Sequence, residues 1–174
     1  MNRKGIAALI TSGAIALASP FLMDFLGKWE GRGQNIVYAD KLAGGLPTVC
    51  KGITKWTSPY PVVVGEYWSD AKCAEVEKQV TIETQTTLAQ CVTNKKVGQN
   101  VFDALTSHAH NVGVRNTCSS RAVRLINAGQ ITAGCDALAH GPNGSPAWSY
   151  ADGKFVRGLY NRRLDERKLC LTKN

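Results

Sequence analysis

The sequence has 174 residues, enough for one globular domain and too few for two domains of usual size. Its hydrophobic fraction of 44% and charged fraction of 20% are those of a folded protein, which excludes a wholly disordered chain. The formal charge of +8 favours polyanionic partners, and because no nucleic-acid-binding module is recognisable, we expect cell-wall polymers or anionic lipid and no nucleic acid.

The amino terminus has the pattern of an export signal. Arg3 and Lys4 precede an uncharged stretch over residues 5–23. Ala16-Leu17-Ala18 resembles a signal-peptidase site, and the stretch is also nearly long enough to span a bilayer. Two outcomes stay open, cleavage after Ala18 or release of the intact segment. A permanent transmembrane helix is disfavoured, because polar residues and glycines are spread through the stretch.

We assign residues 1–26 to this export segment, which continues into the first helix, and residues 20–174 to the folded domain. Ser19-Pro20 predicts the helix start, with serine as the N-cap and proline in the first turn. Four apolar residues then fall on one helical face: Phe21, Leu22, Phe25 and Leu26. The helix leads into Trp29-Glu30-Gly31.

A β-hairpin follows. Residues 37–40 read as a strand that ends in Asp40, Gly44-Gly45 predicts the turn, and residues 47–50 read as a second strand that contains Thr48. Taken singly, Glu30 reads as a solvated helix-end acid, Asp40 as a turn residue and Thr48 as a β-branched strand residue.

The rest of the chain is mainly helical. A long helix is predicted over residues 70–92, capped by Ser69, with an apolar stripe at Cys73, Val76, Val80 and Leu88. From residue 100 onward, helical patterns alternate with breaks at Gly113, Gly129 and residues 141–146. We therefore expect an α+β fold, with a mainly helical lobe, a small β-hairpin lobe and a substrate cleft between them.

Four motifs in this order resemble the phage-type lysozymes of glycoside hydrolase family 24. The first is the set of Glu30, Asp40 and Thr48. The others are His108–Gly113, which resembles the family's aromatic-Asn-Val-Gly segment, Arg121–Gly129, which resembles its Leu-x-Asn-x-Gly helix end, and Gly158–Glu166, which matches Gly-Leu-x-x-Arg-Arg-x-x-Glu. The chain departs from the family in having longer spacings on both sides of Asp40, which predicts an enlarged hairpin. Where the family often has a histidine after the threonine, this chain offers Lys51, Ile53 or Lys55.

The resemblance implies a lysozyme (N-acetylmuramidase) that hydrolyses peptidoglycan between N-acetylmuramic acid and N-acetylglucosamine by an inverting mechanism, with no metal or cofactor. Such hydrolysis needs one protonated carboxylic acid and one carboxylate. Glu30 is expected to be the acid because it ends a helix beside Trp29, and Asp40 the carboxylate because it lies on a wetter hairpin. Thr48 would position the water. By resemblance Asn111 contacts substrate; its alternative role is a buried helix-capping amide.

The weakly apolar amino-terminal segment resembles those of signal-arrest-release endolysins, which tether the enzyme to the inner membrane before release into the periplasm. This implies a periplasmic, monomeric endolysin that causes host lysis. Two alternatives are a lytic transglycosylase and a non-enzymatic cationic protein acting on membranes. The latter would use the basic end of the chain, where we expect Asp165 to pair with Arg162 or Arg163 and absorb part of the charge.

Six cysteines without a Cys-x-x-Cys pair disfavour zinc ribbons and favour disulfides in an oxidising compartment. The sequence leaves the pairing open, but chain proximity and motif placement suggest three pairs: Cys50 with Cys73, Cys91 with Cys118, and Cys135 with Cys170. Similar cysteines bracket the Cys91–Cys118 segment in some relatives. His108, His110 and His140 invite a catalytic-triad or metal interpretation, but the first two lie two residues apart on a helix and face differently, so packing is favoured.

Overall fold

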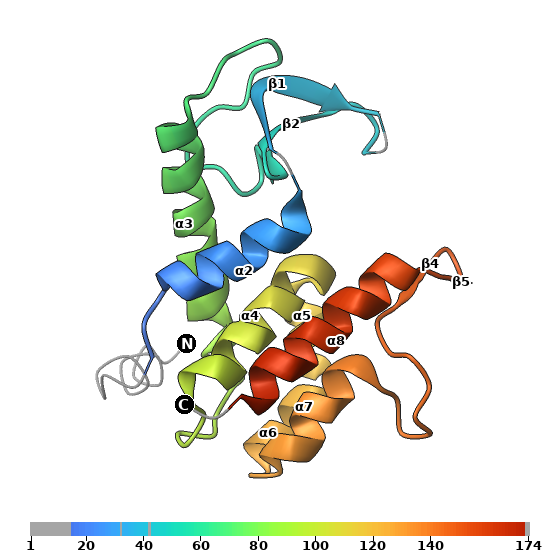
Figure 1. Ribbon diagram of the computed structural model, residues 1–174. Helices are drawn as coiled ribbons and strands as arrows, with labels where there is room; N and C mark the ends of the chain where they lie inside the picture. The colour runs from blue at the N-terminus through green and yellow to red at the C-terminus, as the bar shows by residue number, and fades with distance from the viewer. Residues whose placement is uncertain (1–14, 32, 42, 173–174) are drawn as a thin grey trace. The chain divides into compact units, whose positions relative to one another are not determined.

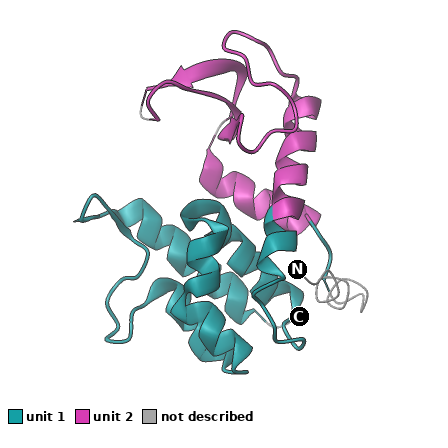
Figure 2. Ribbon diagram, turned by 180° about the vertical axis from the view of Figure 1, so that it is seen from behind, with its two compact units in different colours: residues 1–17, 84–174 teal, residues 18–83 magenta. Residues whose placement is uncertain are grey.

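The computed structural model describes residues 15–31, 33–41 and 43–172. The chain divides into two compact units, unit 1 with Met1–Leu17 and Thr84–Asn174 and unit 2 with Ala18–Glu83 (Figure 2). Within the described ranges, no helix is both long and apolar enough to be a membrane span. The predicted export segment lies, up to residue 14, outside these ranges.

Unit 2 contains a helix, a small sheet and most of a second helix (Figure 1). Its elements are α2 (Pro20–Glu30), β1 (Gln34–Asp40), β2 (Leu46–Cys50), β3 (Ile53–Thr54) and the first part of α3 (Asp70–Leu88). The sheet is antiparallel in the order β1-β2-β3. The predicted hairpin is confirmed, although β1 begins three residues before the expected strand.

Helix α2 begins where the sequence predicts. The Ser19 side chain accepts a hydrogen bond from the Leu22 N–H at 3.1 Å, and proline occupies the first turn. Leu22 and Leu26 are buried, as expected, but Phe21 is 56% exposed. The predicted face was therefore too wide, because the contact is centred on the Leu22–Leu26 row and Phe21 lies about 100° around the helix from it.

The core of unit 2 lies between the sheet and α3. Val37, Val49 and Ile53 come from the strands, and they pack in one cluster with Trp68 and Val76. The disulfide between Cys50 and Cys73 joins the end of β2 to the first turn of α3. One face of the hairpin is thus fixed against the helix, which leaves the other face available for a site.

In the described part of unit 1, the regular elements are helices and one short hairpin. Its elements are α4 (Gln99–Val112), α5 (Val114–Ser119), α6 (Arg121–Asn127), α7 (Ile131–Ala139), β4 (Tyr150–Ala151), β5 (Lys154–Phe155) and α8 (Arg157–Leu171). Helix α8 packs against α4 and α7 (Figure 1). Gly113 ends α4 with a φ of 89°, a conformation that favours glycine. In the described ranges most of the regular structure is helical and the sheets are small and antiparallel, which confirms the α+β prediction.

The three predicted disulfides are confirmed, and the described chain has no free cysteine. They bridge 23, 27 and 35 residues for Cys50–Cys73, Cys91–Cys118 and Cys135–Cys170 respectively. The predicted long helix ends at Leu88 and not at Val92. Beyond it the chain turns tightly, with the Cys91 N–H donating to the Leu88 carbonyl at 3.0 Å and the Asn127 amide donating to the Cys91 carbonyl at 2.8 Å.

Candidate functional site

Asp40 and Thr48 lie on the same face of the hairpin. The strand register pairs Tyr38 with Thr48 and Asp40 with Leu46. Paired residues share a face of an antiparallel sheet, as do residues two apart on one strand, so Tyr38, Asp40 and Thr48 all project to one side. Val37 projects to the other side, into the core. The hairpin therefore has a core face and a polar face, and two of the predicted site residues lie on the polar face.

Asp40 also holds the hairpin turn. Its backbone carbonyl accepts hydrogen bonds from the N–H groups of Ala43 at 3.1 Å and Gly45 at 2.7 Å. Its carboxylate accepts a longer bond, 3.4 Å, from the Ala43 N–H. Gly44 and Gly45 have φ of 67° and 84°, which explains the Gly-Gly sequence of the turn. Asp40 therefore has the turn role that was its alternative interpretation. Its half-buried carboxylate also lies on the polar face of the hairpin.

Thr48 is 4% exposed, and its hydroxyl donates to the Leu46 carbonyl at 3.0 Å. A hydroxyl has one proton and two acceptor lone pairs. Because the proton is committed to the strand, Thr48 Oγ1 is left to act as an acceptor. Its strand-residue role and a role toward water are thus compatible.

Glu30 is the last residue of α2 and is half-buried. The helix ends there because Gly31 has a φ of 69°. Gly33 then passes so close to β2 that a β-carbon on it would lie 2.8 Å from the Cys50 carbonyl carbon. This approach ties the segment after Glu30 to the strand that carries Thr48. Glu30, Asp40 and Thr48 all belong to unit 2, while their catalytic roles stay predictions.

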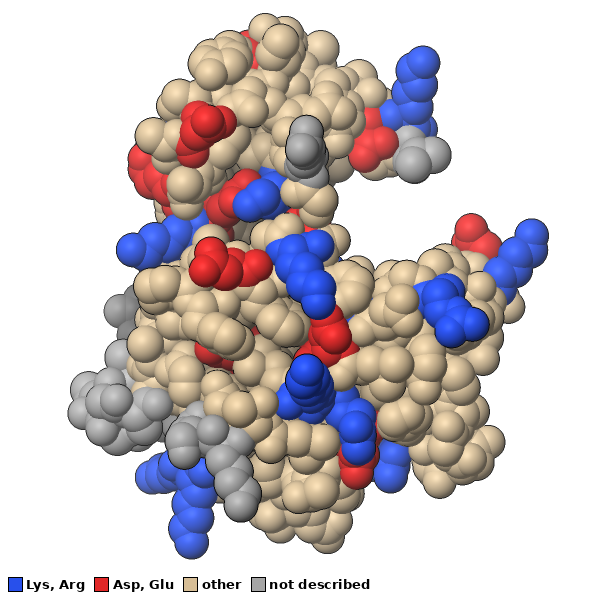
Figure 3. All heavy atoms as spheres, in the orientation of Figure 1, with Lys and Arg blue, Asp and Glu red and all other residues tan. Residues whose placement is uncertain are grey.

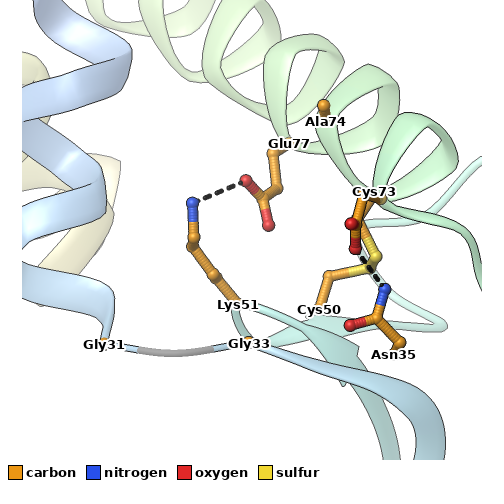
Figure 4. Close-up of a pocket in the computed structure, with 9 residues that line it drawn as sticks. Gly31, Gly33, Asn35, Cys50, Lys51, Cys73, Ala74 and Glu77 are labelled. Atoms are coloured by element: carbon orange, nitrogen blue, oxygen red, sulfur yellow. Dashed lines mark hydrogen bonds and ion pairs between the residues drawn. A yellow bond between two sulfur atoms is a disulfide. The ribbon is translucent and has the colours of Figure 1, made fainter.

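A cavity of about 490 Å³ opens in unit 2 beside this segment (Figure 4). Its lining residues are Gly31, Gly33, Asn35, Cys50, Lys51, Asp70, Cys73, Ala74 and Glu77. Lys51 Nζ and Glu77 Oε2 form an ion pair of 3.2 Å within it, and Asn35 donates to Asp70 at 2.7 Å. Glu30, Asp40 and Thr48 are not among its lining residues, so this cavity is not the predicted cleft, which remains a prediction.

The Lys51–Glu77 pair was not expected from the sequence. Lys51 is one of the three positions offered for the histidine that the family often carries after the threonine. Its ammonium reaches α3, so it braces β2 against that helix. Ile53 is buried in the core, and Lys55 lies over the Trp56 ring at 4.5 Å.

Asn111 is exposed near the end of α4, in unit 1. The alternative role as a buried capping amide is wrong, because α4 is closed by the Gly113 N–H, which donates to the Ala109 carbonyl at 2.9 Å. Because it is exposed, the Asn111 amide is accessible to a substrate. Contact between Asn111 and substrate stays a prediction.

His108 has the packing role that the sequence favoured. It is fully buried, its Nδ1 lies 2.9 Å from Thr117 Oγ1, and its ring packs edge-on against Trp148. Burial, with Arg163 and Arg162 nearby, lowers the pKa of His108 well below its usual value. Burial and Arg162 lower the pKa of His110 to about 4. Both imidazoles are neutral at pH 7, and no group of three potential metal ligands occurs in the described ranges.

A buried charge cluster on α8 is the largest feature that sequence reasoning missed. Glu166 accepts hydrogen bonds from Ser107 at 2.8 Å, Arg162 at 3.2 Å and Arg163 at 2.8 Å. Burial raises the pKa of Glu166, and the two arginines oppose that rise. The two arginines therefore pair with Glu166, while the expected pairing of Asp165 with one of them stays a prediction. The i,i+3 and i,i+4 spacings were the available signal, but spacing alone does not show burial.

Comparisons with known proteins agree with this architecture. The family model described as phage lysozyme matches residues 27–166, which include Glu30, Asp40 and Thr48. The chain is 32% identical over 173 residues to a SAR-endolysin of Enterobacteria phage P21, covering 97% of this chain and 94% of that protein.

Two solved structures share the fold. A mutant of P22 lysozyme superposes with a TM-score of 0.74 at 25% identity, covering 88% of this chain and 97% of that one. The muramidase domain of SpmX from Asticaccaulis excentricus superposes with a TM-score of 0.73 at 21% identity, covering 90% of this chain and 98% of that one. Because the family match spans most of the chain and the P21 relative covers nearly all of it, the chain belongs to the phage lysozyme family.

Proposed function

We propose that this chain is an endolysin that lyses host cells by hydrolysing the β-1,4 bond between N-acetylmuramic acid and N-acetylglucosamine in peptidoglycan. One observation carries the assignment of the site. Asp40 and Thr48 share the polar face of the hairpin, directly after the helix that ends in Glu30, inside the segment that matches the phage lysozyme family. No metal or cofactor is needed for this chemistry.

In this proposal Glu30 protonates the departing sugar oxygen, and the Asp40 carboxylate accepts a proton from the attacking water. Thr48 supplies the second acceptor for that water, because its own proton is donated to the Leu46 carbonyl. Two acceptors would hold both protons of the water and leave a lone pair directed at the sugar carbon. Inversion follows, since water attacks opposite the leaving group.

The product test separates a hydrolase from a lytic transglycosylase. Purified sacculi are digested with the protein, and the masses of the released muropeptides are measured by mass spectrometry. A hydrolase adds one water and leaves reducing ends, whereas a transglycosylase leaves anhydro sugars. Reducing ends are expected, and a majority of anhydro ends would contradict the proposal.

A cell-killing test addresses the cationic alternative. The basic end of the chain offers less free charge than its sequence indicates, because Arg162 and Arg163 are buried against Glu166. We expect Glu30→Gln to abolish both sacculus digestion and lysis from within. Continued lysis by a variant that no longer digests sacculi would favour the membrane-active alternative.

Export to the periplasm is the expected route, as in the SAR-endolysin relative, and we propose that the amino-terminal segment tethers the enzyme before release. Residues around the possible cleavage site are part of the folded protein. Ala16 exchanges two backbone hydrogen bonds with the Gln99 side chain, at 2.7 and 3.0 Å, and Ile15 is buried. These contacts support release of the intact chain.

Amino-terminal sequencing of the protein recovered from the periplasm tests this proposal. A sequence beginning at residue 1 is expected, and one beginning at Ser19 would show cleavage after Ala18. Sedimentation of the same material tests the expected monomer.

Substrate contact by Asn111 is tested by Asn111→Ala. This variant should raise the KM for sacculi and leave the free energy of unfolding unchanged, because the Asn111 side chain is exposed.

A further inference from the structure

Glu30 lies midway between two glycines that contact the hairpin where β2 ends. Gly27 precedes it by three residues, and a β-carbon on Gly27 would be 3.7 Å from the Lys51 Nζ. Gly33 follows it by three residues and packs on the Cys50 backbone. The segment that carries Glu30 is therefore held on both sides by two successive residues of the hairpin, Cys50 and Lys51.

The same two residues of the hairpin are joined to α3. Cys50 forms the disulfide with Cys73, and Lys51 Nζ lies 3.2 Å from Glu77 Oε2. Cys73 and Glu77 are four residues apart, so they lie on one face of the helix, about one turn from each other. Figure 4 shows the Lys51 ammonium between the Glu77 carboxylate and the ribbon of α2. The ion pair therefore connects α3, through the hairpin, to the last turn of α2.

Small residues leave space at this joint. The cavity of about 490 Å³ is bordered by the segment after α2 and by α3, and its lining includes Gly31, Gly33 and Ala74. The Lys51 and Glu77 side chains, 30% and 14% exposed, also line it. Because a cavity offers fewer packing contacts than a filled core, the ion pair is a larger part of what fixes the last turn of α2.

The ammonium group also suits its place beside α2. The helix dipole leaves negative partial charge at the carboxyl end, so a cation beside the last turn is attracted to it. Gly27 has no side chain that would keep the ammonium from the helix backbone. In Figure 3, basic and acidic side chains lie next to one another on unit 2, in the upper part of the view, so its charges form local pairs. The effect of Lys51 should therefore be confined to its own neighbours.

We propose that Lys51, held by Glu77, is a positioning residue for Glu30: it fixes the last turn of α2 so that the Glu30 carboxyl group stays at the reacting bond. The inference rests on the proposed catalytic role of Glu30, and it does not require Lys51 to touch the substrate. A displacement of about 1 Å in a reacting group can lower the rate about 100-fold. Loss of the ammonium group should therefore slow the chemical step and leave substrate binding unchanged.

The test uses the full-length protein and four variants. Lys51→Met keeps the length of the side chain and removes its charge, Glu77→Gln removes the charge of its partner, and Lys51→Arg keeps a cation that can pair with Glu77. The matched control is Lys72→Met. Lys72 is as exposed as Lys51, at 30%, and pairs with Glu66 at 3.4 Å, but this pair joins α3 to the loop before that helix.

Two measurements are made on each variant. Sacculus digestion gives kcat and KM at a temperature where all variants are folded. Hydrogen exchange gives the protection of the α2 amides and does not depend on activity.

We expect kcat to fall about tenfold in Lys51→Met and in Glu77→Gln, with KM within about twofold of the wild-type value. Amides in the last turn of α2 should exchange at least about threefold faster in both variants, because the turn loses its contact with the hairpin. Lys51→Arg should restore kcat and protection to within about twofold of the wild-type values. Lys72→Met should change neither.

Wild-type kcat in Lys51→Met, when Glu30→Gln is inactive, would overturn the proposal and leave the catalytic assignment of Glu30 in place. So would an unchanged exchange rate in α2, or a Lys51→Arg variant as slow as Lys51→Met. Full digestion by Glu30→Gln would refute the proposed function and this inference with it. That outcome is distinguishable from the others, because it does not involve a change at Lys51.

Discussion

Gly33 and the backbone of Cys50 approach so closely that a β-carbon on Gly33 would lie 2.8 Å from the Cys50 carbonyl carbon and 2.9 Å from its oxygen. The neighbouring atoms are backbone, which cannot rotate away as a side chain could. The segment between Glu30 and β1 is therefore held to the end of β2, and the position of Glu30 depends on the absence of a side chain at residue 33.

Gly33→Ala should lower the free energy of unfolding by about 1–3 kcal/mol, because an extra methyl group forces the backbone apart. Sacculus digestion should fall as well, since the displaced segment carries Glu30. Gly158→Ala is the matched control: a β-carbon there meets nothing within 4 Å, and the residue lies in α8. It should be neutral or stabilising by up to about 1 kcal/mol. Urea unfolding of both variants measures the difference, and equal midpoints would contradict the predicted clash.

Glu166→Gln should be among the most destabilising single changes in unit 1. It removes the negative charge that balances Arg162 and Arg163, which are 6% and 0% exposed, and leaves their charges buried without a counter-ion. Breaking a buried ion pair from one side costs about 3–5 kcal/mol. Asp165→Asn, one residue earlier on the same helix and only partly buried, should cost about 1 kcal/mol or less. Similar midpoints for the two variants would show that the cluster is not important for stability.

Stability should fall as the pH is lowered from about 6.5 toward 4. The pKa of His110 is lowered from 6.5 to about 4, so within this window the unfolded chain binds a proton that the folded chain does not. One such histidine destabilises the fold by about 1.4 kcal/mol for each pH unit. His108 adds in the same direction, since its pKa is also lowered. Urea midpoints across this range should fall less steeply for His110→Gln, and parallel slopes would contradict the assignment.

Loss of the Cys50–Cys73 bridge should affect activity more than loss of Cys91–Cys118. Each closes a loop of similar size, 23 and 27 residues, so each Cys→Ser double variant should lose about 3 kcal/mol of stability. The first bridge ties β2, the strand that carries Thr48, to α3. The test compares the sacculus digestion rates of the two double variants at a temperature where both are folded. Equal rates would show that activity does not depend on the disulfide between β2 and α3.

Features set by local chemistry were predictable from the sequence. The Ser19 and Ser69 caps, the Gly44-Gly45 turn and the break at Gly113 all depend on residues within one turn of the chain. The site residues were identified by resemblance, because Glu30, Asp40 and Thr48 taken singly have ordinary structural roles. Asp40 and Thr48 lie on one face of the hairpin, and Glu30 ends the helix before it, which gives that resemblance a physical basis.

Features set by tertiary packing were not predictable. Glu77 meets Lys51 across 26 residues of sequence and Ser107 meets Glu166 across 59, so both contacts form only when distant segments pack. Helical periodicity also assigned Phe21 to a buried face, because it cannot tell how wide the facing surface is. The longer spacings around Asp40 predict an enlarged hairpin, but the register of its strands needed the structure.

The central claim is that Glu30 gives its proton to the leaving sugar. The most direct measurement is the rate of sacculus digestion by Glu30→Gln, with Glu83→Gln as the control, because Glu83 is an exposed glutamate on α3. If the claim holds, the digestion rate of Glu30→Gln falls at least about 100-fold, as expected for loss of a general acid. The urea midpoint of Glu30→Gln and the digestion rate of Glu83→Gln stay near the wild-type values. Undiminished digestion by a folded Glu30→Gln would contradict it.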